Sequence, residues 1–229
     1  MAESSNQERR DFCLSSATCS RRSFALGMVA HAAAVILAAV VLYTAWPGSS
    51  LFSWHPTLMV IGYGLLMTEA ILMFSPESSL MINAMRKSKV RFHWILQAGA
   101  VVCAVGGLMA IYLNKERMGK DHFVSWHGLI GVTTVVYSVV QSMGGINLLY
   151  PKLLKSWMTL AQLKMYHATF GLLGYALACG SLALGINSNW FSREVEGILW
   201  VVCLCCPAIL ALVVMQQVTT AYLGRRIKI

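Results

Sequence analysis

Long apolar runs separated by short polar segments dominate the 229-residue sequence. A helix that crosses a membrane needs about 20 mainly apolar residues in succession. Six runs meet that length: Phe24–Ala45, Thr57–Phe74, Phe92–Leu113, Val124–Leu149, Met165–Ile186 and Gly197–Leu223. The pattern therefore predicts an all-α membrane protein of six transmembrane helices. The six-helix domain is expected over residues 23–224, between polar tails over 1–22 and 225–229.

The composition also favours a membrane environment. Hydrophobic residues make up 57% of the chain and charged residues only 12%, about half the charged share of a typical soluble domain. A chain of this kind lacks the charge to cover a water-exposed surface. The lipid bilayer is therefore the expected solvent.

Most of the basic residues fall on the side of the membrane that holds both predicted tails. They are Arg9, Arg10, Arg21, Arg22, Arg86, Lys87, Lys89, Arg91, Lys152, Lys155, Lys164, Arg225, Arg226 and Lys228. The opposite side holds only Lys115, Arg117, Lys120 and Arg193. By the positive-inside rule, both termini are expected in the cytosol. Orientation and anionic lipid account for the net charge of +9, and the scatter of the charges over short segments argues against nucleic-acid binding.

Four consecutive predicted helices each begin near a histidine: His55, His93, His127 and His167. Because helix direction alternates, His55 and His127 are expected near the non-cytosolic face, and His93 and His167 near the cytosolic face. Each pair comes from alternate helices, which lie diagonally across a four-helix bundle. Ionisable residues inside a membrane are costly and usually functional.

Two histidines at each level suit a haem iron, which takes two axial ligands from opposite sides, better than zinc, which takes three or four protein ligands. Two imidazoles leave no open iron position, and this favours electron transfer over oxygen chemistry. Most positions four and seven residues after these histidines are small, such as Gly171 and Gly174 after His167. These positions predict room for a flat ring along the helices.

Four other polar residues are secondary candidates. His31 in the first span has no evident partner at its depth, and packing or local hydrogen bonding is expected there. His122 and Ser125, before the fourth span, are expected to line a pocket at the non-cytosolic face. Glu69 in the second span must be paired, protonated or hydrogen-bonded, and a role in proton balance is the alternative.

At its histidines the sequence resembles the cytochrome b561 family. The matching pieces are Leu51-Phe52-Ser53-Trp54-His55-Pro56, Phe74-Ser75-Pro76-Glu77, the basic run Arg86 to Arg91 before His93-Trp94, Ser125-Trp126-His127-Gly128, and Leu163-Lys164-Met165-Tyr166-His167. The likeness runs from about residue 24 to the C-terminus. The order and spacing of the pieces are more specific than any single piece.

The resemblance implies a central four-helix bundle that encloses two b-type haems. It also implies cytosolic ascorbate as electron donor and monodehydroascorbate radical or ferric iron as acceptor on the far side. An endoplasmic-reticulum or vesicle membrane, and often a homodimer, are further implications. The function expected is thus an ascorbate-dependent transmembrane reductase, with His93 and His167 at the entry haem and His55 and His127 at the exit haem.

The resemblance also implies that basic side chains seven and three positions before His93 contact ascorbate. Arg86 keeps the first charge, whereas Val90 replaces the second. The candidate donor residues are Arg86, Lys87, Lys89, Arg91 and Lys164. A cationic patch would concentrate ascorbate, which is a monoanion. The alternative is that these charges only set the topology.

Two other classes of protein remain open at this point. A histidine-based ion transporter would be colourless and would favour charged residues near the membrane midplane. A non-enzymatic scaffold would bind haem without being reduced by ascorbate.

Overall fold

The computed structural model describes residues 2–150 and 158–223, and side chains from residue 20 to residue 222 within those ranges. The described chain is built from helices alone. In order they are α1 (Ala2–Ala45), α2 (Trp54–Met59), the π-helix η1 (Val60–Met67), α3 (Thr68–Leu72), α4 (Arg86–Arg117), α5 (Trp126–Leu149), α6 (Leu160–Ile186), α7 (Asn189–Glu194) and α8 (Gly197–Leu223). The elements α2, η1 and α3 follow one another without a break.

Six stretches of the described helices are long and apolar enough to cross a membrane. They are Ser20–Ala45, Trp54–Leu72, Arg86–Arg117, Trp126–Leu149, Leu160–Ile186 and Gly197–Tyr222. The predicted six-helix membrane fold is therefore confirmed. The outer surface of the bundle is apolar, with Val102 71% and Ile198 78% exposed. Such a surface suits lipid rather than water, and the chain is a multi-pass membrane protein.

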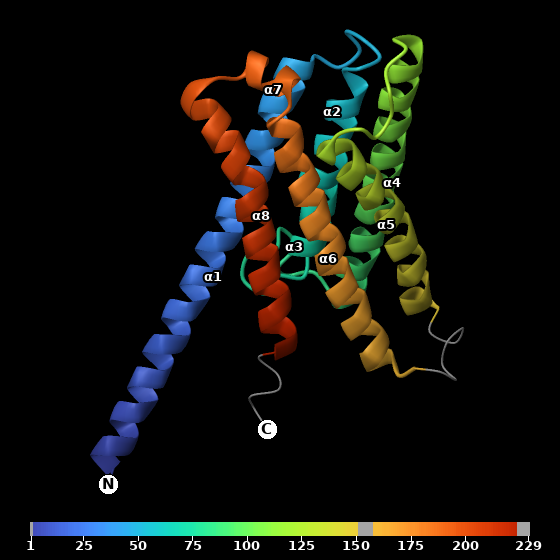
Figure 1. Ribbon diagram of the computed structural model, residues 1–229. Helices are drawn as coiled ribbons and strands as arrows, with labels where there is room; N and C mark the ends of the chain where they lie inside the picture. Colours follow the sequence, from blue (N-terminus) through green and yellow to red (C-terminus); the bar gives the residue numbers. More distant parts are fainter. Residues whose placement is uncertain (1, 151–157, 224–229) are drawn as a thin grey trace.

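The two ends of the bundle differ in charge. Helix α1 begins and α8 ends at the same end, whereas α7 and the segment after α1 lie at the opposite end (Figure 1). We call the first the basic end, because α4 begins there with Arg86, Lys87, Lys89 and Arg91. The opposite end is called the far end. Lys152, Lys155, Arg225, Arg226 and Lys228, and the predicted tail over 225–229, lie outside the described residues.

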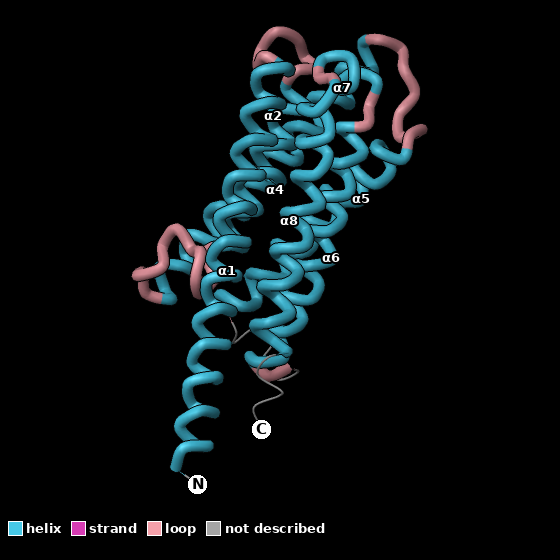
Figure 2. Tube along the Cα trace, turned by 90° about the vertical axis from the view of Figure 1, so that its left-hand side faces the viewer, coloured by secondary structure: helices cyan, strands magenta, loops and turns pink. Residues whose placement is uncertain are grey.

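The α2–η1–α3 span lies among α1, α4 and α6, while α5 packs against α6 and α1 packs against α8. Figure 2 shows the same bundle from the side, with the segment between α3 and α4 projecting near its basic end. Small side chains allow the central helices to approach one another closely. At Gly62 in η1, an added Cβ would lie only 3.0 Å from the carbonyl oxygen of Ala100 in α4. The span that carries His55 is thus held tightly against α4.

Some local features differ from the sequence expectations. The basic run Arg86–Arg91 forms the first turns of α4 rather than a connection, since Lys and Arg are good helix formers. The helix α1 continues through the predicted polar tail from Ala2. The short helix α7 and the π-helix η1 have no counterpart in the predicted pattern.

Candidate functional site

The far end of the bundle brings His55 of α2 and His127 of α5 together. Their ring centres are 5.9 Å apart and the ring planes are inclined by 80°. Each ring is fixed from another helix. His55 Nδ1 lies 3.0 Å from the carbonyl oxygen of Gly107 in α4, and His127 Nδ1 lies 3.0 Å from that of Ser181 in α6.

The basic end contains the second pair, His93 of α4 and His167 of α6. Their ring centres are 6.3 Å apart, with an angle of 78° between the planes. His93 Nδ1 lies 2.8 Å from the carbonyl oxygen of Ala70 in α3. The two pairs therefore share a geometry, although they are built from different helices at opposite ends of the bundle.

The hydrogen bonds define which ring nitrogen is available. A carbonyl oxygen only accepts, so Nδ1 of His55, His93 and His127 carries the proton and donates it. The lone pair of a neutral ring is then on Nε2. Metal-binding histidines commonly donate their other N–H in this way, which fixes the ring and raises its basicity. Three of the four rings are thus prepared to bind a metal through Nε2.

His167 has a different partner. The side-chain Nε2 of Gln141 in α5 donates to the backbone oxygen of His167 at 2.7 Å and lies 3.2 Å from the ring Nδ1. The carbonyl partner fixes the amide orientation, because it requires a donor. One ring of the basic-end pair therefore faces an amide nitrogen rather than a carbonyl oxygen.

The spacing within each pair suits a metal between the rings. Two imidazoles bonded to one metal at about 2 Å each have ring centres roughly 6 Å apart. The observed 5.9 Å and 6.3 Å match this separation. The donor set at each end, two imidazoles, is also the set that a haem iron accepts as axial ligands.

Glycines of α5 and α6 lie against the histidines in a reciprocal arrangement. An added Cβ at Gly185, near the end of α6, would lie 3.2 Å from Cε1 of His127 at the start of α5. An added Cβ at Gly145, near the end of α5, would lie 3.3 Å from Cε1 of His167 at the start of α6. Only a residue without a side chain leaves each ring in its present position.

The prediction that small residues leave open space along the helices fails at the two positions after His167, whereas Met59 and Gly131, four residues after His55 and His127, line the cavity at the far end. An added Cβ at Gly171 would meet Nε2 of Gln141 at 3.2 Å, and one at Gly174 would meet the ring of Tyr137 at 2.7 Å. The glycines of α6 therefore make room for side chains of α5. Close packing of membrane helices uses the same small residues as a cofactor pocket, so sequence spacing does not separate the two uses.

A cavity of about 250 Å³ lies at the far-end pair, and its lining includes His55, His127, His122 and Ser125. His122 Nε2 is 2.7 Å from Oε1 of Glu116. Ser125 also caps α5, because its Oγ accepts from the backbone N–H of Gly128 at 3.1 Å. The structure thus brings both sequence candidates to the pocket that contains the far-end histidines.

The candidate donor residues lie close in sequence to the basic-end pair. Arg86, Lys87 and Arg91 are exposed and Lys89 is partly exposed, all within two turns before His93. Lys164 is exposed three residues before His167 on α6. The start of α4 adds the partial positive charge of a helix N-terminus. This part of the basic end is suited to attract an anion.

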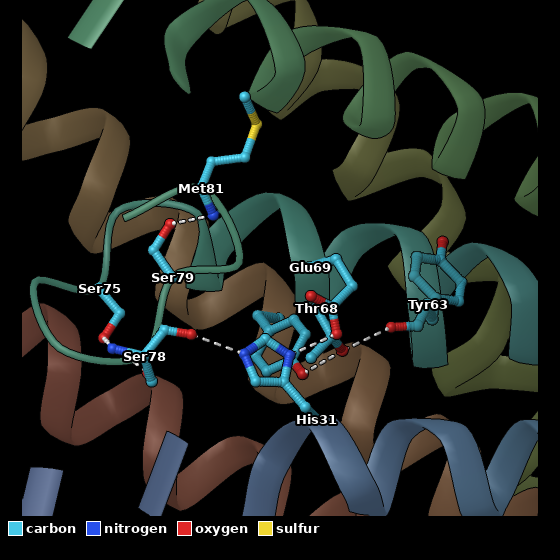
Figure 3. A network of polar contacts seen from close by, with 9 residues as sticks. His31, Tyr63, Thr68, Glu69, Ser75, Ser78, Ser79 and Met81 are labelled. Carbon is cyan, nitrogen blue, oxygen red and sulfur yellow. Dashed lines mark hydrogen bonds and ion pairs between the residues drawn. The ribbon is translucent and has the colours of Figure 1, made fainter. Parts of the chain in front are cut away.

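The expectation that His31 has no partner at its depth is wrong. Its Nδ1 lies 2.8 Å from Oε1 of Glu69 in α3, and its Nε2 donates to the backbone oxygen of Ser78 at 2.9 Å. Figure 3 shows His31 between Glu69 and Ser78. The sequence contained one signal of this contact, since His31 and Glu69 are each the only residue of their predicted span that can carry a charge near neutral pH.

Comparison with known proteins adds independent evidence. The family model of eukaryotic cytochrome b561 matches residues 54–192. Transmembrane reductase CYB561D2 of Bos taurus is 50% identical over 200 residues, which cover 87% of this chain and 90% of the relative. The protein of the same name from Homo sapiens is 50% identical over 202 residues, or 88% and 90% of the two chains.

A more distant relative is transmembrane ascorbate ferrireductase 1 of Arabidopsis thaliana. It is 32% identical over 183 residues, which cover 71% of this chain and 70% of the relative. Relatives that are named reductases support an oxidoreductase activity here.

The family match covers more than half of the chain, and the matched segment contains all four paired histidines. The family is haem-binding, which agrees with the donor set at each end of the bundle. The chain is therefore a member of the eukaryotic cytochrome b561 family.

Proposed function

We propose that this protein transfers electrons across a membrane through two b-type haems, from cytosolic ascorbate to monodehydroascorbate radical or ferric iron on the other side. The observation that carries the proposal is the presence of two histidine pairs, at opposite ends of one bundle, each with the spacing of a two-imidazole metal site. His93 and His167 would hold the entry haem. His55 and His127 would hold the exit haem.

Haem supplies one-electron chemistry when it is bound, and the protein supplies ligands, orientation and environment. The carbonyl oxygens of Ala70, Gly107 and Ser181 keep three of the rings in the binding tautomer. With two histidines as its ligands, each iron would have no position left for oxygen or substrate. This arrangement favours transfer at the edge of the haem rather than chemistry at the metal.

The separation of the pairs supports a relay. Helix α4 carries His93 of one pair and Gly107, which holds His55 of the other. These two positions are 14 residues apart, or roughly 21 Å at about 1.5 Å rise per residue. The hydrocarbon core is about 30 Å thick, so one haem would not cross it and two in series would.

Ascorbate as donor is supported by the exposed cations at the basic end, Arg86, Lys87, Arg91 and Lys164. A monoanion would be concentrated there beside the proposed entry haem. The name of the Arabidopsis thaliana relative includes ascorbate and a ferric reductase activity. At the far end, the cavity beside His55 and His127 is the proposed site of the acceptor.

The proposal places the basic end and both termini in the cytosol, because of the excess of Lys and Arg at that end. The membrane proposed is that of the endoplasmic reticulum or a cytoplasmic vesicle. Assembly as a homodimer belongs to the same proposal.

Purified protein in sealed vesicles with a trapped ferric chelate tests this function. We expect added ascorbate to produce the reduced b-type absorption bands and then ferrous iron inside the vesicles. His93→Ala and His127→Ala should each abolish transfer while the vesicles stay sealed. A colourless protein would favour an ion transporter, and haem bands that ascorbate does not produce would favour a scaffold.

A further inference from the structure

Four consecutive residues of α3 each make a hydrogen bond to a different helix. The contacts are Thr68 Oγ1 with Tyr175 Oη of α6 at 2.7 Å, Glu69 Oε1 with His31 Nδ1 of α1 at 2.8 Å, the Ala70 oxygen with His93 Nδ1 of α4 at 2.8 Å, and the Ile71 oxygen with Gln217 Nε2 of α8 at 3.0 Å. We call residues 68–71 the α3 hub. The hub joins α4 and α6, which carry the basic-end pair, to α1 and α8, the two membrane-spanning helices that carry none of the paired histidines.

His31 on α1 is held on both sides, by a partly buried contact with Glu69 and a buried one with Ser78. His31 is 8% exposed and Ser78 is 5% exposed. The ring of His31 lies between Glu69 and the segment that contains Ser75 and Ser78 (Figure 3). One turn before His31, Gly27 contacts Ser78 so closely that an added Cβ would collide with the serine side chain. His31 therefore binds α1 to both α3 and the segment that leads to Arg86.

Hydrogen bonds weaken steeply with distance and angle. The Ala70 oxygen, which accepts the hydrogen bond from His93 Nδ1, belongs to the residue between Glu69 and Ile71. These neighbours are held by His31 from α1 and by Gln217 from α8. A shift of either neighbour moves the peptide groups around Ala70, and the 2.8 Å contact with His93 changes with them.

We propose that His31, Glu69 and Gln217 are positioning residues that, through the α3 hub, set the ligand strength of His93. The role of α1 and α8 in the redox site is then to hold the Ala70 carbonyl oxygen in place. This inference rests on the proposed function, because it takes His93 as a ligand of the basic-end haem. It adds residues on two helices that contribute no ligand.

The direction of the effect follows from the chemistry of the ring. A strong Nδ1–H···O=C hydrogen bond raises the basicity of the ligating nitrogen, and a more basic ligand stabilises ferric over ferrous iron. Displacement of the Ala70 oxygen should therefore raise the midpoint potential of the basic-end haem. The far-end haem should keep its potential, since His55 and His127 are held by Gly107 and Ser181 instead.

The test compares purified full-length variants by haem content, redox titration and low-temperature electron paramagnetic resonance of the ferric haems. His31→Leu, Glu69→Leu and Gln217→Leu remove the positioning contacts. Glu69→Gln keeps a side chain that can pair with His31 Nδ1 in either protonation state, because an amide both accepts and donates, and this variant should stay close to wild type. Matched controls are Thr44→Val on α1 and Thr219→Val on α8, whose hydroxyls donate only within their own helices.

We expect the leucine variants to raise the potential of the basic-end haem, or to lose that haem, while the far-end haem and both controls stay unchanged. Equal shifts of both haems, or no shift in any variant, would overturn the proposal, because mere helix packing predicts a general loss of stability. Where a leucine variant loses both haems, Gln217→Ala is measured in its place. A change confined to the basic-end haem would then support the proposal, and equal shifts of both haems, or no shift, would overturn it.

The wild-type protein tests the proposed function separately in the same experiment. Fewer than two haems per chain would overturn that function. Two haems with no response to the hub variants would overturn only the role of the hub.

Discussion

The glycine contacts give a sharp test of where each of the two proposed haems would be held. Gly145 and Gly144 are neighbours in α5, but only Gly145 faces a paired histidine. An added Cβ at Gly145 would lie 3.3 Å from Cε1 of His167, whereas one at Gly144 has nothing within 4 Å. We predict that Gly145→Leu weakens the basic-end haem and that Gly144→Leu, the matched control, leaves both haems in place.

The size of the effect follows from the contact. The Cβ alone is already slightly inside the usual contact distance of about 3.5–4.0 Å, and leucine adds three more carbon atoms on the same side. Overpacking of this kind costs about 1–3 kcal/mol. At about 1.36 kcal/mol per factor of ten, this cost corresponds to roughly 5- to 150-fold weaker haem binding. Both substitutions gain the same helix propensity, so the control isolates the contact with His167.

The assay is haem content per chain together with the ferric resonance spectrum, which separates the two haems. The equivalent test at the far end is Gly185→Leu, because an added Cβ at Gly185 would press on His127. Its control is Gly180→Leu, since an added Cβ at Gly180 has nothing within 4 Å. Gly185→Leu should weaken only the far-end haem. Equal losses from Gly145→Leu and Gly144→Leu, or loss of the far-end haem from Gly145→Leu, would refute the reasoning.

Three further predictions concern single side chains. Gln141→Glu should lower the midpoint potential of the basic-end haem in a redox titration, because a carboxylate accepts strongly from the Nδ1–H of His167. An unchanged potential would show that this side chain does not act on the ring. Arg86→Gln should raise the KM for ascorbate several-fold with little change in kcat, because a charge that attracts the anion is lost. The attraction is strongest at low salt, so an unchanged KM there would mean that Arg86 only helps to set the orientation of the protein in the membrane. Ser125→Ala should remove the N-cap of α5 and lower the free energy of unfolding by about 1 kcal/mol. Calorimetry would detect this loss as a fall in Tm of about 2–4 °C, and an unchanged Tm would contradict the capping role.

The sequence was sufficient for the six spans because a bilayer restricts the chain. Backbone groups in lipid must be satisfied within a helix, so length and apolar content nearly define each span. Alternating helix direction then predicted that His55 would lie near His127 and His93 near His167, and the structure brings these rings together. Both arguments concern position along the membrane normal, which is the coordinate that hydropathy reports.

Contacts between helices side by side could not be predicted in the same way. His31 and Glu69 are 38 residues apart, and Gln141 and His167 are 26 apart. Helices that are apolar all round carry little pattern to show which face meets which neighbour. The π-helix η1 adds to the problem, because its wider turns change the faces that Thr68, Glu69 and Ala70 present.

The most direct measurement of the central claim is haem content per chain in purified wild-type protein and in two double variants. We predict two haems in wild type, and one in each of His55→Ala/His127→Ala and His93→Ala/His167→Ala. Ascorbate should still reduce the haem that remains in the first double variant. A wild-type chain with one haem or none, or double variants that each lose both haems while the protein remains folded, would contradict two independent sites at the two ends of the bundle.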